Sequence, residues 1–148
     1  LERGHRLVAD DVIILKRRRG YMLVGGGVDI TKHHIEIRGL GIINVYEMFG
    51  VRGIRQNKRV EVEVRLEDKE DLSHFDRTGL EKRTVEYLDV SIPFIKLPIF
   101  PGKNISVIVE AVALNTILRM TGHDSAQQLN ERLIEQMRKK TEKHNSAK

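Results

Sequence analysis

The fold assignment depends on the stretch Glu36-Ile37-Arg38-Gly39-Leu40-Gly41-Ile42-Ile43-Asn44. It combines a carboxylate, a guanidinium group and two glycines within nine residues. Such a combination suits phosphate and metal ions, because the charged groups bind them and glycine lets the backbone approach closely. A charged pair beside a glycine turn explains the same residues without any function. The stretch therefore needs support from other segments.

A pair of aspartates, Asp10 and Asp11, lies upstream of this block. It follows Arg6-Leu7-Val8-Ala9, which we expect to form a short buried strand. Adjacent carboxylates at a strand end can hold Mg²⁺ or take a proton from a hydroxyl group, because hard cations prefer oxygen ligands and the strand end holds them rigidly. A turn stabilised by aspartate side chains remains the common explanation of an isolated Asp-Asp pair.

A third segment, Phe75-Asp76-Arg77-Thr78-Gly79, places an arginine in a predicted polar excursion over Asp68–Gly79. An arginine in a loop either acts on an anion or bridges carboxylates. None of the three segments decides between a functional and a structural role by itself.

Composition and charge restrict the class of protein. A length of 148 residues and a hydrophobic content of 40% predict one globular domain. The absence of cysteine excludes disulfides and Cys-bound metal, which fits the cytoplasm. The net charge of +5 is compatible with a nucleic acid, an acidic protein or a phosphate ligand.

We expect no membrane partner, because no apolar run approaches the ~20 residues that span a bilayer. Polar residues interrupt the longest such run, 105–120, at Ser106, Glu110, Asn115, Thr116 and Arg119. No signal peptide is recognisable. The first residues, Leu1-Glu2-Arg3-Gly4, are typical of a helix end, so we expect the chain to start inside a helix with further residues upstream.

Several strands are expected in the first half of the chain. Val12–Leu15 and Tyr21–Val24 are predicted to form a hairpin around a turn at Lys16–Gly20, and Gly25-Gly26-Gly27 are predicted to end the second strand. Val60–Glu67 alternates strictly between apolar and charged residues, which predicts a half-buried strand. The sequence therefore contains β-structure on both sides of the nine-residue block.

The second half is predicted to end in two helices. Thr84–Leu88 and Val90–Ile92 are further strands, punctuated by prolines, in a sheet that is mixed or antiparallel. Asn104 is a suitable N-cap for a helix over Ile105–Met120, and Asp124 for a second helix over Ser125–Glu142. The apolar residues of the last helix are expected to face the body, and its cations to face water. These apolar residues are Leu129, Leu133 and Met137, and the cations are Arg132, Lys139, Lys140 and Lys143.

Taken together, the segments resemble the catalytic domain of the bacterial HPr kinase/phosphorylase. The resemblance covers essentially the whole chain. It is carried by the motifs Gly4–Asp11, His34–Val45, Phe49-Gly50, Phe75-Asp76-Arg77-x-Gly79, Pro98-x-x-Pro101-Gly102-x-Asn104 and Val109-Glu110-Ala111-Val112-Ala113-x-Asn115.

The resemblance implies a P-loop α/β domain related to phosphoenolpyruvate carboxykinase, here N-terminally truncated, with a mixed sheet and two C-terminal helices. It implies a homo-oligomer, a hexamer, that acts on the sugar-transport phosphocarrier HPr in carbon catabolite control. Enzymes of this family phosphorylate a serine of HPr with ATP or pyrophosphate and Mg²⁺ or Mn²⁺. They also reverse the modification by phosphorolysis. The domain would comprise a sheet and active-site loops over residues 5–103 and helices over about 105–142.

The resemblance also assigns roles to residues. Asp11 would accept the serine proton in the kinase direction and return one during dephosphorylation, with support from Asp10. Glu36 would bind the metal, and Arg38 and Arg77 would belong to the active site. The catalytic-loop region would comprise Ile35, Glu36, Ile37, Arg38, Gly39, Leu40, Gly41, Ile42, Ile43 and Asn44. A loose phosphoryl transition state is stabilised by such charges.

The chain departs from the family pattern in two places. The phosphate-loop pattern G-x-x-x-x-G-K-[ST] does not occur, because the only Gly-Lys pair, Gly102-Lys103, is followed by Asn104. The family usually has arginine at Phe100 and Lys103, in a segment that serves dephosphorylation and HPr contact. That segment comprises Pro98, Ile99, Phe100, Pro101, Gly102 and Lys103. Losing the guanidinium groups is expected to affect phosphorolysis and HPr docking more than the kinase reaction.

Two alternatives belong to other classes of protein. A basic nucleic-acid-binding module would use Lys16–Arg19 and the C-terminal lysines, but it has no recognisable binding motif and leaves Glu36–Asn44 unexplained. A fragment with a purely structural role in an oligomer is the other. We expect the 148-residue chain alone to be inactive, because it has no phosphate loop.

Overall fold

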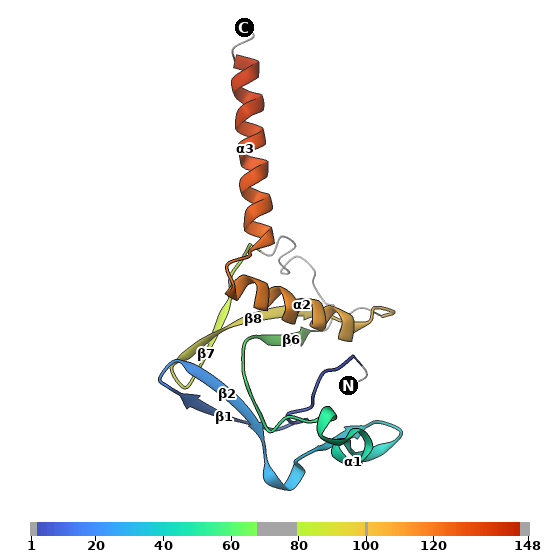
Figure 1. Ribbon diagram of the computed structural model, residues 1–148. Helices are drawn as coiled ribbons and strands as arrows, with labels where there is room; N and C mark the ends of the chain where they lie inside the picture. Colours follow the sequence, from blue (N-terminus) through green and yellow to red (C-terminus); the bar gives the residue numbers. More distant parts are fainter. Residues whose placement is uncertain (1–2, 68–79, 100, 146–148) are drawn as a thin grey trace. The chain divides into compact units, whose positions relative to one another are not determined.

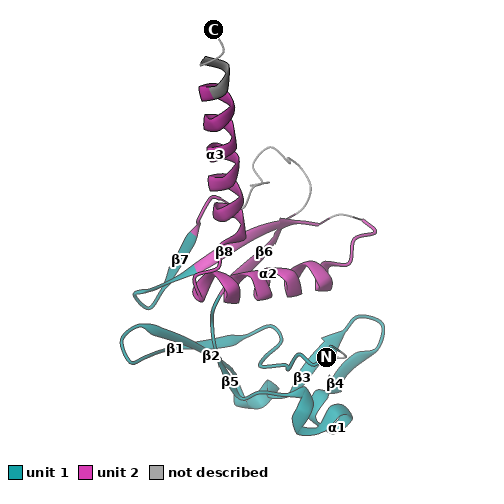
Figure 2. Ribbon diagram, turned by 45° about the horizontal axis from the view of Figure 1, so that its top comes forward, with its two compact units in different colours: residues 1–61, 84–92 teal, residues 62–83, 93–148 magenta. Residues whose placement is uncertain are grey.

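The computed structural model describes residues 3–67, 80–99 and 101–145. The chain forms two compact units, each built from two separate stretches of sequence (Figure 2). Unit 1 comprises residues 1–61 and 84–92, and unit 2 comprises residues 62–83 and 93–148.

The main sheet of unit 1 has the strand order β1-β2-β5 and is antiparallel (Figure 1). Its strands are β1 (Ile13–Arg18), β2 (Met22–Gly27) and β5 (Asn57–Arg59). The predicted hairpin is confirmed, but its turn is shorter than expected. Three of the residues that we assigned to the turn belong to β1. The chain reverses through Arg19 and Gly20, which have φ of 53° and 77°.

The glycines at the end of β2 do not end the strand, so that prediction was wrong. A Cβ atom at Gly25 would lie 3.0 Å from Ile13 Cγ2, and one at Gly26 would lie 2.5 Å from Asn57 Oδ1. The absence of side chains therefore lets both neighbouring strands pack closely against β2. Glycine in a strand interior often marks such a close approach.

The hydrophobic core of unit 1 lies between β2 and a second hairpin. This hairpin joins β7 (Thr84–Tyr87) to the start of β8 (Val90–Pro98) through two residues with left-handed φ, Leu88 and Asp89. The core consists of the buried Leu23, Val90 and Ile92, with Leu15, Val60, Val85 and Tyr87 packed against them. Arg17 Nη1 also lies 2.8 Å from Asp89 Oδ2, but both side chains are exposed, so this ion pair contributes about 1 kcal/mol or less.

Unit 1 also contains the smaller elements that carry the nine-residue block. β3 (His34–Ile37) and β4 (Gly41–Asn44) form a separate antiparallel hairpin. Two short 3₁₀ helices, η1 (Asp29–Thr31) and η2 (Gly50–Gly53), flank this part of the chain. Between β4 and η2 lies the short helix α1 (Val45–Phe49).

In unit 2, β6 (Glu63–Glu67) pairs with β8 in parallel, with Glu63 opposite Phe94. Because the two-residue turn between β7 and β8 can join only antiparallel neighbours, the sheet of β6, β8 and β7 is mixed. The strand predicted from Val60 is shorter than expected, because Val60 packs into the core of unit 1. The predicted excursion over Asp68–Gly79 lies outside the described residues.

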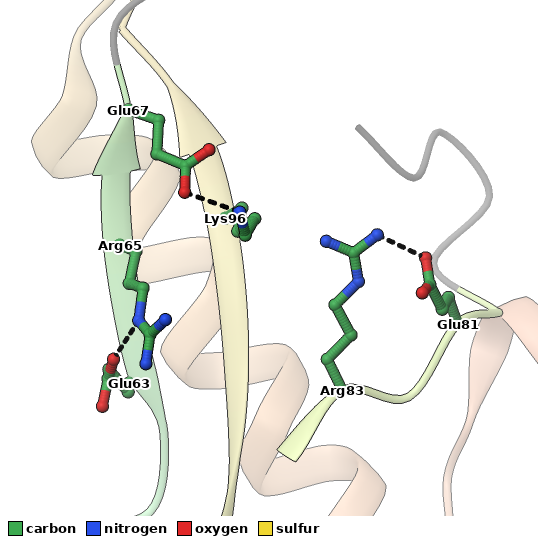
Figure 3. A network of polar contacts seen from close by, with 6 residues as sticks. All are labelled: Glu63, Arg65, Glu67, Glu81, Arg83 and Lys96. Atoms are coloured by element: carbon green, nitrogen blue, oxygen red, sulfur yellow. Dashed lines mark hydrogen bonds and ion pairs between the residues drawn. The ribbon is translucent and has the colours of Figure 1, made fainter. Parts of the chain in front are cut away.

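Charged side chains alternate along β6 and meet β8 on one face (Figure 3). Arg65 pairs with Glu63 and lies 4.5 Å above the ring of Phe94, while Lys96 Nζ lies 2.8 Å from Glu67 Oε1. Residues 63, 65 and 67 share this face because strand side chains alternate. The prolines do not interrupt β8, since proline has a φ that strands accept and loses only its N–H.

Both predicted C-terminal helices are confirmed. α2 spans Ile105–Met120 and α3 spans Ser125–Asn145. Asn104 Oδ1 accepts a hydrogen bond from Val107 N at 3.3 Å, and Asp124 Oδ1 accepts one from Gln127 N at 3.3 Å. The sequence signals for both helix starts were therefore sufficient.

The apolar residues of α3 do not face the body, so that expectation was wrong. Leu129, Leu133 and Met137 are 59%, 50% and 69% exposed. α3 extends away from the sheet of its own unit (Figures 1 and 2). Over the described ranges, no individual helix has the length and apolar character to cross a membrane, and only α2 and α3 counted together, with a 70° bend between them, meet those criteria.

Candidate active site

The nine-residue block forms a hairpin in unit 1. Glu36 lies opposite Ile42 in the register of β3 and β4, and the chain reverses through Arg38, Gly39 and Leu40. Gly39 has φ of 86° and Gly41 has φ of 99°, values that side chains disfavour. The two glycines are thus required by the turn itself, and Arg38 is left exposed at its tip.

A hydrogen bond connects this hairpin to the aspartate pair. Asp10 Oδ2 accepts a hydrogen bond from the Glu36 N–H at 2.9 Å, across 26 residues of sequence. Asp11 is exposed and makes no hydrogen bond with the described part of the chain. The two adjacent aspartates therefore differ: Asp10 holds the hairpin, whereas the carboxylate of Asp11 is open to a ligand.

The strand that we predicted over Arg6–Ala9 is not formed. Instead Leu7 makes a single parallel β-bridge with Ile54. Leu7 N–H donates to the Gly53 carbonyl at 2.8 Å, and Arg55 N–H donates to the Leu7 carbonyl at 2.8 Å. The bridge still anchors the chain three residues before Asp10. The pairing goes no further than this bridge, since neither Leu7 nor Ile54 belongs to a strand.

Asn44 has a structural function that our sequence reasoning missed. Its Oδ1 accepts hydrogen bonds from Tyr46 N at 3.0 Å and Glu47 N at 3.3 Å, and its Nδ2 donates to Glu47 Oε1 at 3.2 Å. Asn44 is thus the N-cap of α1, and the adjacent Val45 is fully buried. The Asn-x-x-Glu spacing, similar to a capping box, was the available signal.

A metal at this site would have to be shared with a phosphate ligand, because the described side chains do not form a complete metal site. Across residues 3–67, 80–99 and 101–145, no group of three or more Asp, Glu, His or Cys side chains could hold a metal ion. Mg²⁺ usually takes one or two carboxylates and completes its shell with substrate phosphates and water. The exposed side chain of Glu36 can supply one such carboxylate. Its contact with Asp10 is made by the backbone N–H of Glu36 and not by the carboxylate.

The other predicted site residues are only partly described. Arg77 and Phe100 lie outside the described residues. In unit 2, Pro98 ends β8, Ile99 N–H donates to the Glu67 carbonyl at 2.9 Å, and Gly102 has φ of 80°. Pro101 and Lys103 are exposed. The contacts within unit 1 therefore bring together the aspartate pair and the glycine-rich hairpin, and the proline-containing segment belongs to unit 2.

The fold and the site together define a class of protein. It is a mixed α/β domain in which a glycine-rich hairpin carries the exposed Glu36 and is hydrogen-bonded to Asp10. Residues 1–133 match the family model described as the HPr Serine kinase C-terminal domain. The chain belongs to this family.

Individual relatives agree with this assignment. The chain is 48% identical over 147 residues to the HPr kinase/phosphorylase of Chloroherpeton thalassium, covering 99% of this chain and 43% of the relative. It is 42% identical over 135 residues to that of Geobacter sulfurreducens, covering 91% and 42%. The Hpr(Ser) kinase/phosphatase structure from Coxiella burnetii has a TM-score of 0.76 at 34% identity, covering 88% of this chain and 79% of that one. The chain spans about two fifths of the length of these curated relatives.

Proposed function

We propose that the protein containing this domain is a bifunctional kinase/phosphorylase of the phosphocarrier HPr. It transfers a phosphoryl group from ATP or pyrophosphate to a serine of HPr and removes it by phosphorolysis, in carbon catabolite control. The family assignment and the names of the relatives support this proposal. The single observation that carries it is the hydrogen bond from Glu36 N–H to Asp10, because it joins the aspartate pair to the glycine-rich block.

Asp11 is the general base of the proposed kinase reaction. The serine oxygen attacks the terminal phosphorus of the donor, the serine O–P bond forms, and the donor bridge bond breaks to release ADP or phosphate. Asp11 takes the serine proton, which its exposed carboxylate is free to do. In phosphorolysis, an oxygen of inorganic phosphate attacks the phosphorus of phosphoserine, the P–O–P bond of pyrophosphate forms, the serine O–P bond breaks, and Asp11 gives its proton to the departing serine oxygen.

Glu36 would hold Mg²⁺ or Mn²⁺, with Asp10 keeping the backbone of Glu36 in place. When bound, the metal supplies positive charge that neutralises the phosphate oxygens. Arg38, exposed at the hairpin tip, and Arg77 would bind the same oxygens through their guanidinium groups. These residues account for charge stabilisation and proton transfer.

The proposal includes a P-loop domain of the phosphoenolpyruvate-carboxykinase type, with a phosphate loop outside this sequence. Since the chain itself has no such pattern, we expect the 148 residues alone to be inactive. The proline-containing segment from Pro98 to Lys103 would contact HPr during dephosphorylation. The complete protein would act in the cytoplasm, where ATP is available, without a nucleic-acid or membrane partner.

We also propose that the complete protein is a homo-oligomer, a hexamer. The exposed apolar stripe of α3, formed by Leu129, Leu133, Ile134 and Met137, supports an assembly that covers it. An amphipathic helix is usually stabilised by burial of its apolar face.

A direct test is phosphorylation of HPr by the complete protein. We expect ATP or pyrophosphate to label HPr in the presence of Mg²⁺, and expect no label after chelation of the metal or on an HPr variant whose acceptor serine is alanine. Intact-protein mass spectrometry measures the added phosphoryl group. A complete, folded protein that leaves HPr unmodified with both donors would contradict the proposal.

A further inference from the structure

His33 lies at the base of the β3–β4 hairpin, one residue before β3. Its carbonyl accepts a hydrogen bond from Val45 N–H at 2.8 Å, so the pairing continues one step beyond His34 and Asn44. Its φ is 67°, in the left-handed region that non-glycine residues seldom adopt. Such a backbone conformation persists where the surrounding contacts fix it. His33 is thus held in place by more than the local preference of the chain.

The imidazole ring of His33 is oriented by packing. It lies against the ring of Tyr46, with centroids 5.6 Å apart and an angle of 32° between the planes. The Nε2 atom is buried and has no hydrogen-bond partner within the described ranges. A buried polar atom without a partner is uncommon and calls for an explanation. Here the aromatic contact, and not a hydrogen bond of Nε2, determines where the ring lies.

The two rings join the ends of the glycine-rich block. His33 precedes the first strand of the hairpin, and Tyr46 is the second residue of α1, directly after the last strand. A two-stranded hairpin is marginally stable by itself, so contacts at its base determine its orientation. The Glu36 N–H that donates to Asp10 lies within this hairpin.

We propose that His33 is a positioning residue, which fixes the hairpin through the Tyr46 ring and the Val45 N–H and thereby aligns Glu36 with Asp10. The kinetic part of this inference rests on the proposed kinase function, whereas its structural part does not. His33 acts through Glu36 and does not touch the reacting atoms. Its loss would impair transfer without removing any group that binds HPr or nucleotide.

The structural part is tested by amide hydrogen exchange in the complete protein. His33→Asn removes the ring and keeps a residue type that tolerates left-handed φ, whereas Tyr46→Phe keeps the aromatic contact and serves as the matched control. We expect exchange across residues 35–44 to rise by about tenfold or more in His33→Asn and to stay at the wild-type rate in Tyr46→Phe. Unchanged exchange in His33→Asn would overturn the inference, whatever the activity of the protein.

The kinetic part is tested by a double-mutant cycle. We expect His33→Asn and Tyr46→Ala each to lower the turnover number for HPr by about tenfold or more, because small misplacements are costly, with the KM for ATP within about twofold. Turnover in the double variant should fall by about the same factor as in either single variant, since both substitutions remove one shared contact. The positioning role would be contradicted if the losses of turnover in the two single variants multiplied in the double variant. It would also be contradicted if only the KM changed. A wild-type protein without HPr kinase activity would refute the proposed function and leave the exchange result standing.

Discussion

At the scale of single residues, the two adjacent aspartates have different environments. One oxygen of Asp10 is engaged by the backbone N–H of Glu36, whereas Asp11 projects an exposed carboxylate. The resemblance seen in the sequence assigned proton transfer to Asp11 and a supporting role to Asp10, but it could not say what Asp10 contacts. The distinction depends on a contact between segments 26 residues apart, which no local pattern encodes.

The contact of Asp10 makes a testable distinction between two substitutions. Asp10→Asn keeps an oxygen that can accept the Glu36 N–H, whereas Asp10→Ala removes it. We therefore expect turnover in the complete protein to stay within about threefold of wild type for Asp10→Asn and to fall by about tenfold or more for Asp10→Ala. Steady-state HPr phosphorylation measures both. An equal loss in the two variants would mean that the charge of Asp10, and not its hydrogen bond, is what matters.

At the scale of elements, the sequence predicted the helix starts and the hairpin that depend on interactions between residues close in sequence. The caps Asn104 and Asp124 marked the starts of α2 and α3, and the apolar runs on both sides of the turn at Lys16–Gly20 predicted the β1–β2 hairpin. The glycines of β2 were misjudged because their strand membership depends on close packing with Ile13 and Asn57. The intrinsic strand propensity of glycine contains no information about such tertiary contacts.

In the candidate site, too, features set by local interactions could be predicted from the sequence, and features set by tertiary contacts could not. The turn at Gly39 and Gly41 could be predicted from residue type, because both need positive φ. The helix α1 and its Asn44 cap were missed, since five residues give little helical periodicity. The resemblance to a family predicts a functional role for this hairpin, and only the structure connected it to Asp10.

Asp124 at the start of α3 gives a prediction for pH dependence. Partial burial by itself would raise its pKa, but the Gln127 N–H and the charges of Arg119 and Lys82 favour the carboxylate more, so the pKa lies below the ordinary 3.8. The charged Asp124 carboxylate therefore stabilises the folded state fully above pH 3.8, and this contribution is lost as the pH falls through the lower folded pKa. We expect Asp124→Asn to melt at a lower temperature than wild type at neutral pH, and we expect this difference to shrink in acid. A constant difference across this range would contradict the shifted pKa.

At the scale of the whole molecule, the apolar stripe of α3 is exposed in the single chain, and a complete assembly is proposed to cover it. Amphipathic periodicity predicted which residues of α3 are apolar, but it could not predict what covers them. Leu133 is half exposed in the structure. If oligomer formation buries this stripe, a charge placed there must be desolvated and will weaken the assembly.

Light scattering of the complete protein measures this effect. We expect Leu133→Glu to shift the mass from a hexamer toward smaller species, by at least about tenfold in dissociation constant. Gln128→Glu adds the same charge to another exposed position of α3 and should leave the mass unchanged. If both variants assemble like the wild type, the stripe of α3 is not a contact between subunits.

The complete protein should carry out transfer in both directions through the same carboxylate. Asp11 is proposed to take the serine proton during phosphorylation and to return it during phosphorolysis, so one substitution must impair both reactions. Asp29 is an exposed aspartate of the same unit, in η1, and Asp29→Asn is the matched control.

The decisive measurement is the rate of HPr phosphorylation and of phosphoserine-HPr phosphorolysis by Asp11→Asn in the complete protein. We predict that both rates fall by about a hundredfold or more while ATP affinity stays within about twofold, because asparagine cannot accept the proton. Asp29→Asn should match the wild type in all three measurements. Retained turnover in Asp11→Asn, in either direction, would contradict the assignment of Asp11 as the proton-transferring residue.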